Sequence, residues 1–164
     1  MRLLWWSGVT SAVCVGLAVA GLLGPRSLLA GQRVDVFKAD SVWHGTCGQT
    51  DTKSSYPMIL FVKHRQDDAF EGVTYYPTLG NALLKVKGRI DKNGKMMFRE
   101  DKLLYGETYD KDRVVVTGIT YTAKLDKKGL TGGAEITEVT NPKTNETVRL
   151  KEAAKVTFSL KLGE

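Results

Sequence analysis

Two histidines, a cysteine and three acidic runs are the side chains of this chain that could do chemistry. His44 and Cys47 have the spacing H-x-x-C, and His64 is the other histidine. A zinc site needs three or four ligands, and residues i and i+3 of an extended strand point to opposite faces. We therefore expect no metal site and no cofactor, and we expect Cys47 to be a small buried hydrophobic residue.

The acidic runs are Asp67-Asp68, Glu100-Asp101 and Asp110-Lys111-Asp112. General acid–base catalysis needs two carboxyl groups that converge in one cleft with separated pKa values. These runs lie beside lysines in segments that resemble turns, which is typical of a solvated surface. The sequence also lacks the glycine-rich strand-to-helix turn of a nucleotide-binding site. It therefore predicts a protein that is not an enzyme.

The chain is mildly basic, with a net charge of +6 over 164 residues. The positive charge is spread along the sequence, whereas nucleic-acid binding favours a basic stripe with interleaved aromatic residues. We expect no nucleic-acid partner. Cys47 is the one cysteine apart from Cys14 in the amino-terminal segment. A domain without that segment has no intramolecular disulfide and depends on its hydrophobic core.

The amino-terminal segment predicts export. Residues 3–24 contain no charged side chain, and Arg2 precedes them. A positive flank followed by an apolar run is typical of an export signal, but this run is also long enough to cross a bilayer as a helix, at about 1.5 Å per residue. We predict residues 1–30 as a signal peptide or an uncleaved signal-anchor and residues 31–164 as a single domain. That domain would be periplasmic, extracellular or membrane-anchored outside the cytoplasm, with residues 3–24 as a candidate membrane tether.

From residue 41 onward, apolar and polar residues alternate with the period of two that is typical of β-strands. Residues 155–162 are the clearest case, because four apolar side chains alternate there with polar ones. One helical turn at most is expected, at residues 151–155. The expected strands are 56–65, 70–77, 82–91, 95–100, 102–107, 113–126, 130–139 and 155–162.

Turns and interior glycines indicate how these strands connect. Asp91-Lys92-Asn93-Gly94 and Asp126-Lys127-Lys128-Gly129 each join two strands, with glycine at the position that requires a positive φ. Gly72, Gly88 and Gly118 lie inside strands, where glycine usually marks a bend or a bulge. A sheet that curls into a small barrel needs such bends. We predict an all-β domain, an antiparallel meander of about eight strands closed into a small barrel.

The start of the domain resembles the calycins, the group of lipocalins, fatty-acid-binding proteins and avidins. Their barrel begins with Gly-x-Trp, and the tryptophan lies across the closed end. The matching residues here are Ser41-Val42-Trp43, with serine in place of glycine and Phe37 upstream. The resemblance covers residues 37–162 and implies a lipocalin-like barrel. It also implies that a small, mostly apolar molecule binds in the mouth of the barrel.

The residue types near the expected strand ends fit a ligand site. Tyrosines combine an apolar ring with a polar tip, and methionines are adaptable pocket liners. Residues 75–85 keep large apolar side chains around Pro77 and Gly80-Asn81, so both a lid over the mouth and a plain hairpin connection fit this segment. The predicted ligand-binding residues are Trp43, Tyr56, Met58, Tyr75, Tyr76, Leu79, Tyr105 and Tyr121.

Two functions remain open from the sequence. The first is an exported, non-enzymatic binding protein that holds a small lipophilic molecule in its barrel. The second is an envelope-associated β-domain that acts through its outer surface, on a protein partner or as a structural module. Interior side chains can fill a barrel of about eight strands completely, so the first function needs a cavity. The second needs a large exposed apolar patch or an open sheet edge.

Overall fold

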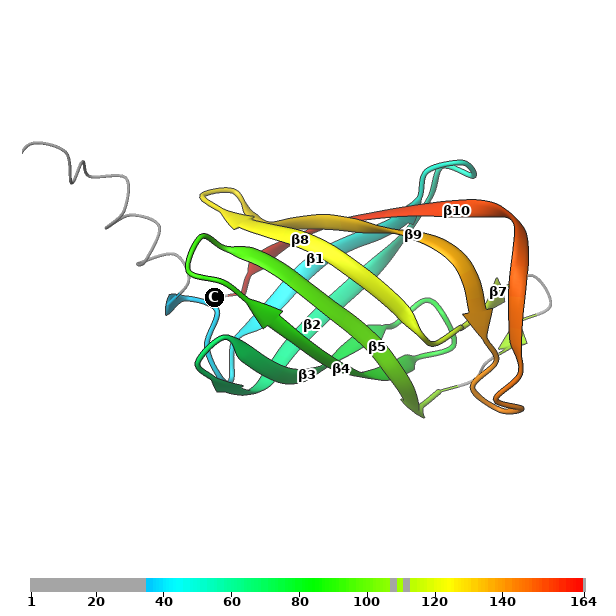
Figure 1. The fold of residues 1–164 in the computed structure, drawn as a ribbon, viewed down its shortest axis with the longest axis horizontal. Coiled ribbons are helices and arrows are strands. Elements are labelled where there is room, and N and C mark those ends of the chain that lie inside the picture. Colours follow the sequence, from blue (N-terminus) through cyan, green and yellow to red (C-terminus); the bar gives the residue numbers. More distant parts are fainter. Residues whose placement is uncertain (1–34, 107–108, 111–112, 164) are drawn as a thin grey trace, which may run out of the picture.

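The structure, a computed structural model, describes residues 35–106, 109–110 and 113–163. In these ranges eight strands close into one antiparallel barrel, and two further strands form a separate small sheet (Figure 1). The predicted all-β barrel is therefore confirmed, while the predicted leader, residues 1–30, lies outside the described residues. The strands are β1 (Val42–Gln49), β2 (Ser54–Gln66), β3 (Ala69–Tyr76), β4 (Ala82–Ile90), β5 (Lys95–Tyr105), β6 (Tyr109–Asp110), β7 (Arg113–Val114), β8 (Ile119–Asp126), β9 (Gly129–Thr140) and β10 (Thr147–Leu162).

The barrel is a meander in which each strand pairs with the next barrel strand along the chain. The first and last strands then pair with each other, with Trp43 of β1 opposite Leu162 of β10. β6 and β7 fall between β5 and β8 in the sequence and pair only with each other among the described residues. Every barrel strand has a neighbour on both sides over part of its length. The described pairing of β9 with β8 ends at Gly133, and that of β10 with β1 ends at Val156. The outer ends of β9 and β10 pair mainly with each other and extend past the closed part of the barrel.

Alternating side chains build the core inside the barrel. In β10, Phe158 and Leu160 are buried, whereas Thr157, Ser159 and Lys161 are exposed. Every other barrel strand also contributes buried apolar side chains to this core. Burial of each large one contributes about 1.5–3 kcal/mol. The core holds the described fold together without a disulfide, since its buried cysteine is free.

The two turns that begin with aspartate form as predicted. In the first, Asp91 Oδ1 accepts hydrogen bonds from the backbone N–H groups of Asn93 and Lys95, at 2.8 and 2.9 Å. Gly94 follows with a φ of 77°, in the left-handed region that favours glycine. In the second turn, Asp126 accepts the same kind of bond from the backbone N–H two residues on. These turns fix the register of their hairpins.

Interior glycines lie where the sheet bends or a large ring needs space. Gly72 of β3 lies beside a shift of register in β2, between Val62 and His64. At Gly88, an added Cβ would lie 2.6 Å from ring atoms of Phe70. The predicted link between interior glycines and a bulge is confirmed at the first position. At the second, the missing side chain makes room for an aromatic ring.

Three local predictions differ from the structure. The strands expected at 95–100 and 102–107 are one strand, β5, because two register shifts against β4 absorb the break in alternation. The strand expected at 113–126 is divided, with Gly118 at a φ of 87° before β8. The helical turn expected at 151–155 is wrong, because these residues belong to β10. So short a segment cannot nucleate a helix by itself. Ala154 and Lys155 pair with β9, and the residues just before them fall in an irregularity of that pairing.

Aromatic rings close the barrel at the end where β1 begins and β10 ends. Phe37 precedes β1, is fully buried, and contacts Trp43 and Phe70 with ring centroids 5.7 and 4.9 Å apart. The Trp43 Nε1–H donates to Ser41 Oγ at 3.2 Å, and the Arg65 guanidinium donates to the Phe37 backbone carbonyl. Trp43 thus lies buried in the closed end with its polar atom hydrogen-bonded.

Candidate functional site

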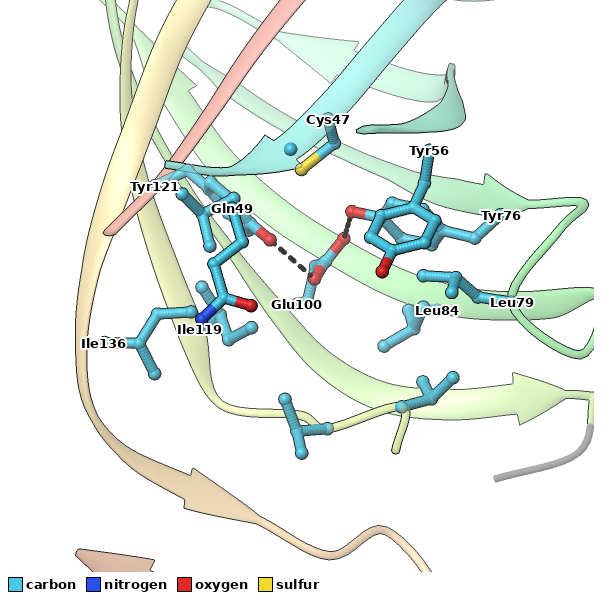
Figure 2. Close-up of a pocket in the computed structure, with 14 residues that line it drawn as sticks. Cys47, Gln49, Tyr56, Tyr76, Leu79, Leu84, Glu100, Ile119, Tyr121 and Ile136 are labelled. Carbon is cyan, nitrogen blue, oxygen red and sulfur yellow. Dashed lines mark hydrogen bonds between the residues drawn. The ribbon is translucent and has the colours of Figure 1, made fainter. Parts of the chain in front are cut away.

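A cavity of about 180 Å³ lies near the other end of the barrel, where β1 ends and β2 begins (Figure 2). Its walls are mainly apolar, and it is partly open to solvent. The interior side chains therefore do not fill this end of the barrel. The lining residues are Cys47, Gly48, Gln49, Tyr56, Tyr76, Leu79, Leu84, Glu100, Val115, Val116, Ile119, Tyr121, Ile136 and Val156.

The period of two explains which residues reach this cavity. Cys47 and Gln49 are two residues apart on β1, and Ile119 and Tyr121 are two apart on β8. Each pair therefore points to the same, inner side of its strand. Each remaining barrel strand contributes one residue, and Leu79, Val115 and Val116 lie outside the barrel strands. The lining is therefore assembled from residues far apart in the sequence.

Glu100 places a carboxyl group in this mainly apolar wall (Figure 2). Its side chain is 2% exposed. Oε1 accepts hydrogen bonds from Thr74 Oγ1 at 2.5 Å and from the Tyr76 hydroxyl at 2.8 Å. Oε2 accepts one from the Tyr121 hydroxyl at 3.3 Å. Three hydroxyl groups, two from β3 and one from β8, thus hold the carboxyl group in place.

Burial dominates the protonation of this cluster. It raises the pKa of the Glu100 carboxyl above its ordinary value, and the hydroxyl donors only partly oppose this rise. Burial also raises the pKa of Tyr76 and of Tyr121 well above the ordinary tyrosine value, and the charge of Glu100 adds to the rise. Both phenols therefore stay protonated, and each donates a hydrogen bond to Glu100.

Cys47 borders the same cluster, but its environment does not favour a nucleophile. Burial, and then the charge of Glu100, raise the pKa of the Cys47 thiol to about 12, while the Tyr76 hydroxyl lowers it. The thiolate is the reactive form of cysteine, so Cys47 remains a protonated thiol near neutral pH. No histidine is among the described residues that line the cavity. The described surroundings of Cys47 therefore do not activate its thiol.

The buried carboxyl group predicts a pH-dependent difference in stability between the wild-type protein and Glu100→Gln. A carboxyl group whose pKa is higher in the folded state costs stability once it ionises. This cost is absent below the unfolded value, about 4.3 for glutamate, and grows as the pH rises through the folded value. In thermal unfolding, we expect similar melting temperatures at pH 4 and a more stable Glu100→Gln at pH 8, by about 4 °C for each kcal/mol relieved.

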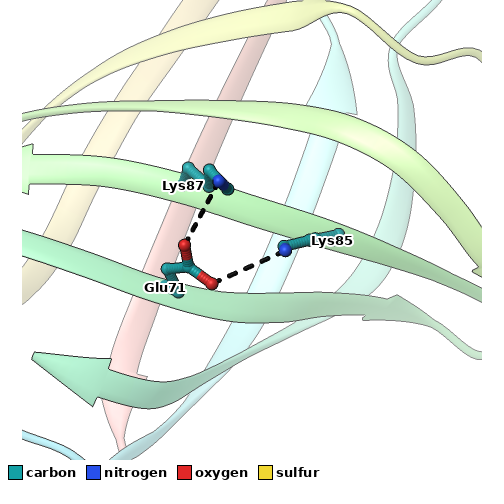
Figure 3. Close-up of polar contacts among 3 residues, drawn as sticks. All are labelled: Glu71, Lys85 and Lys87. Carbon is teal, nitrogen blue, oxygen red and sulfur yellow. Dashed lines mark ion pairs between the residues drawn. The ribbon is translucent and has the colours of Figure 1, made fainter.

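Glu71 lies on the outer face of the barrel (Figure 3). It supplies a control in which the same substitution should change stability at high pH in the opposite direction. Its carboxylate lies 3.2 Å from Lys87 Nζ and 3.6 Å from Lys85 Nζ, and these lysines lower the pKa of Glu71. Glu71→Gln removes a favourable charge, so it should be slightly less stable than the wild-type protein at pH 8 and similar at low pH. If Glu100→Gln behaves in the same way, the buried carboxylate carries no cost.

Half of the predicted ligand-binding residues line the cavity, namely Tyr56, Tyr76, Leu79 and Tyr121. Leu79 belongs to the loop between β3 and β4, where its N–H donates to the Tyr76 carbonyl and its carbonyl accepts from Ala82 N–H. This loop is a compact hairpin connection that places one apolar side chain at the cavity. Ligand contact by these residues stays a prediction.

The other predicted residues lie elsewhere. Trp43 is buried at the closed end and Met58 is fully buried in the core, and neither lines the cavity. Tyr75 precedes an inward-facing tyrosine and so points outward, where its hydroxyl donates to Asn81 Oδ1 at 2.8 Å. Tyr105 is 71% exposed at the end of β5. Residue type suggested these positions. Trp43 and Met58 face the interior but lie at other levels of the barrel, whereas Tyr75 and Tyr105 are on its outside.

The expectation that the run Glu100-Asp101 is a solvated surface is wrong for Glu100. Met96, Phe98 and Glu100 follow one another on the inner face of β5. Asp101 takes the outer face, where it forms an ion pair with Arg99 at 3.1 Å. The alternation that starts at Met96 is the signal that could have placed Glu100 inside the barrel.

His44 and Cys47 do not act together, because they lie on opposite faces of β1. Cys47 is buried, whereas His44 is exposed. In the described ranges, no three side chains of His, Cys, Asp or Glu are grouped so that they could hold a metal ion. The structure therefore offers no reason to assign a metal to this site.

Two further findings bear on the chain, one on membrane spans and one on similarity to other proteins. No helix in the described part of the chain is both long and apolar enough to span a bilayer. The chain matches no family model, no curated protein and no solved structure. Its function must therefore be inferred from its own residues and geometry.

Proposed function

We propose that this protein is an exported, non-enzymatic binding protein, a calycin-like barrel that holds a small, mostly apolar molecule in its cavity. The cavity itself carries this proposal. It has a volume of about 180 Å³, and its walls are mainly apolar. It lies towards the opposite end of the barrel from Trp43, where a calycin-like barrel would have its mouth.

The volume limits the size of the ligand. Apolar cavities of about 150 Å³ bind benzene, whereas sites for drug-sized molecules span about 300–1,000 Å³. A cavity of about 180 Å³ fits a molecule with one ring and a short substituent. A long acyl chain would not fit within it.

Two further observations support a calycin-like, exported protein. Trp43 is buried beside Phe37 at the closed end of an eight-stranded meander, which is the place of the tryptophan in calycins. The uncharged run at residues 3–24 follows Arg2, as in an export signal. Both a cleaved leader and a membrane tether are compatible with binding inside the barrel.

An outer-surface function has weaker support. The large exposed hydrophobic side chains of the described residues include Met97 on β5, Val148 on β10 and Val36 before β1, which are separate parts of the barrel. Leu104 and Tyr105 are adjacent at the end of β5. Leu162 at the end of β10 is the remaining one. Because these side chains come from three segments of the chain, no single described strand presents the long run of exposed apolar residues that would favour a protein interface.

Binding of a neutral aromatic compound tests the proposal. Titration of the isotope-labelled protein with toluene should give saturable NMR shift changes at cavity residues such as Ile119 and Ile136, and none at Phe37 in the closed end. Native mass spectrometry of protein purified gently from its own cells should show a small adduct that is lost on denaturation. A protein with no adduct and no saturable toluene binding would refute the proposal and favour the outer surface.

A further inference from the structure

We propose that the molecule held in the barrel carries a protonated primary amine and that Glu100 binds this group as its counterion. The ligand would then be a small amine with an apolar body of about one ring. This ligand class is narrower than the small, mostly apolar molecules of the proposed function, and the amine proposal rests on that function.

The carboxyl group of Glu100 is available to a molecule in the cavity although it is almost fully buried. It lines the cavity, and Figure 2 shows it among the other lining residues. Among the hydrogen bonds of the described residues, Oε1 accepts those from Thr74 and Tyr76, whereas Oε2 accepts the longer one from Tyr121, at 3.3 Å. A carboxylate offers about four acceptor positions. Oε2 therefore keeps capacity for a donor that enters the cavity.

The described lining of the cavity provides no cation for this carboxyl group. No lysine, arginine or histidine is among the described residues that line it. Lys85 and Lys87 of β4 lie on the outer face, where both form ion pairs with Glu71 (Figure 3). Arg99 also points outward, to Asp101. A buried carboxylate without a cation costs free energy, and an opposite charge nearby recovers part of that cost. An ammonium group on the ligand would supply this charge.

The described groups that face Glu100 stay uncharged near neutral pH, so Glu100 is the one among them that can ionise there. They are Thr74 and Tyr76 from β3, Tyr121 from β8 and Cys47 from β1. The pKa of the Cys47 thiol is about 12, and the pKa values of both phenols lie well above their ordinary value. Amine affinity should therefore rise with pH as Glu100 ionises, and fall again once the amine loses its own proton.

A purely structural role for Glu100 makes a different prediction. The hydroxyl groups of Thr74, Tyr76 and Tyr121 hold the carboxyl group whether or not a ligand is present. If Glu100 served only to hold these three hydroxyl groups in position, the protein would bind a neutral molecule and a cationic molecule of the same shape equally well. Selectivity between two such molecules therefore separates ligand binding from structural support.

Benzylamine and benzyl alcohol are matched probes for this selectivity, because they differ only in the head group. We would measure both affinities by calorimetry at pH 7.5, for the wild-type protein, Glu100→Gln and the outer-face control Glu71→Gln. A charge within about 4–6 Å changes a carboxyl pKa by about 1–3, and each unit corresponds to about a tenfold change in affinity. Benzylamine should therefore bind at least about tenfold more tightly than benzyl alcohol to the wild-type protein and to Glu71→Gln. In Glu100→Gln the two affinities should become similar.

Each outcome decides the proposal. Equal affinities in the wild-type protein, or a preference that survives in Glu100→Gln, would overturn the assignment of an amine but leave the binding function standing. Failure of both probes to bind would overturn the amine and the binding function together. If Glu100→Gln does not fold, the pH dependence of binding to the wild-type protein tests the proposal by itself. Its preference for benzylamine must then weaken as the pH falls and Glu100 takes up a proton, and a constant preference would overturn the proposal.

Discussion

Trp43→Ala is expected to lower the free energy of unfolding by about 3–5 kcal/mol, the range found for the removal of a large aromatic side chain from a core. Trp43 is 1% exposed and contacts Phe37, whose ring in turn contacts Phe70. Loss of the indole would leave a cavity between these rings at the closed end. Urea unfolding, followed by circular dichroism, would measure the change.

Trp43→Phe is the matched control. It keeps an aromatic ring in place but loses the hydrogen bond from Nε1–H to Ser41 Oγ, so we expect a cost of about 1–2 kcal/mol. Toluene affinity should stay unchanged in this variant, because Trp43 does not line the cavity. If Trp43→Ala costs no more than Trp43→Phe, the ring does not seal this end of the barrel.

Val156→Phe is expected to weaken toluene binding by about a hundredfold while the barrel stays folded. Val156 lines the cavity from β10, opposite Gln49 of β1. The larger ring would occupy the space of three or four ligand carbons, each worth about 0.8 kcal/mol when buried. Since about 1.4 kcal/mol is a factor of ten in affinity, the loss amounts to about two factors of ten. NMR titration with toluene would measure it.

Val148→Phe controls for the added ring on the same strand. Val148 is 51% exposed on β10, so its replacement should change neither the toluene affinity nor the melting temperature noticeably. A Val156→Phe variant that still binds toluene like the wild-type protein would place the binding site outside the cavity. Thermal unfolding of both variants would separate a blocked cavity from a misfolded barrel.

Most strands of this protein could be predicted because their local pattern and their tertiary role agree, whereas β1 is not among the expected strands. The alternation in β10 places Phe158 and Leu160 inside, and the turn at Asp91 carries its own hydrogen bonds and its glycine. Each of these signals lies within a few residues of sequence. Closure into a barrel follows when many such strands have bends and no long helix interrupts them.

The buried carboxyl group of Glu100 and its three hydroxyl donors could not be predicted in the same way. Glutamate is rarely buried, so its residue type suggests a surface even where the alternation through Met96 and Phe98 points inward. The three hydroxyl groups that make its burial tolerable come from β3 and β8. Which strands face each other across a barrel is set by closure, and no local pattern contains that information.

The tyrosines show the same limit in another form. Tyr76 and Tyr121 point inward to Glu100, whereas Tyr75 and Tyr105 point outward. All four are tyrosines near strand ends, so residue type and position along the strand do not separate them. The phase of each strand does separate them, and phase becomes reliable only when the register of the hairpin is known.

Pairing of β1 with β10 sets the order in which this chain can fold. The closing pair joins the first and last strands of the barrel, so it forms only after β10 has been synthesised. Contacts between such distant segments make β-barrels slow to fold, typically in milliseconds to seconds. A chain that still lacks β10 has free edges on β1 and β9, which are templates for pairing with another copy. The last strand therefore completes the core and also ends the period in which the chain is most prone to aggregate.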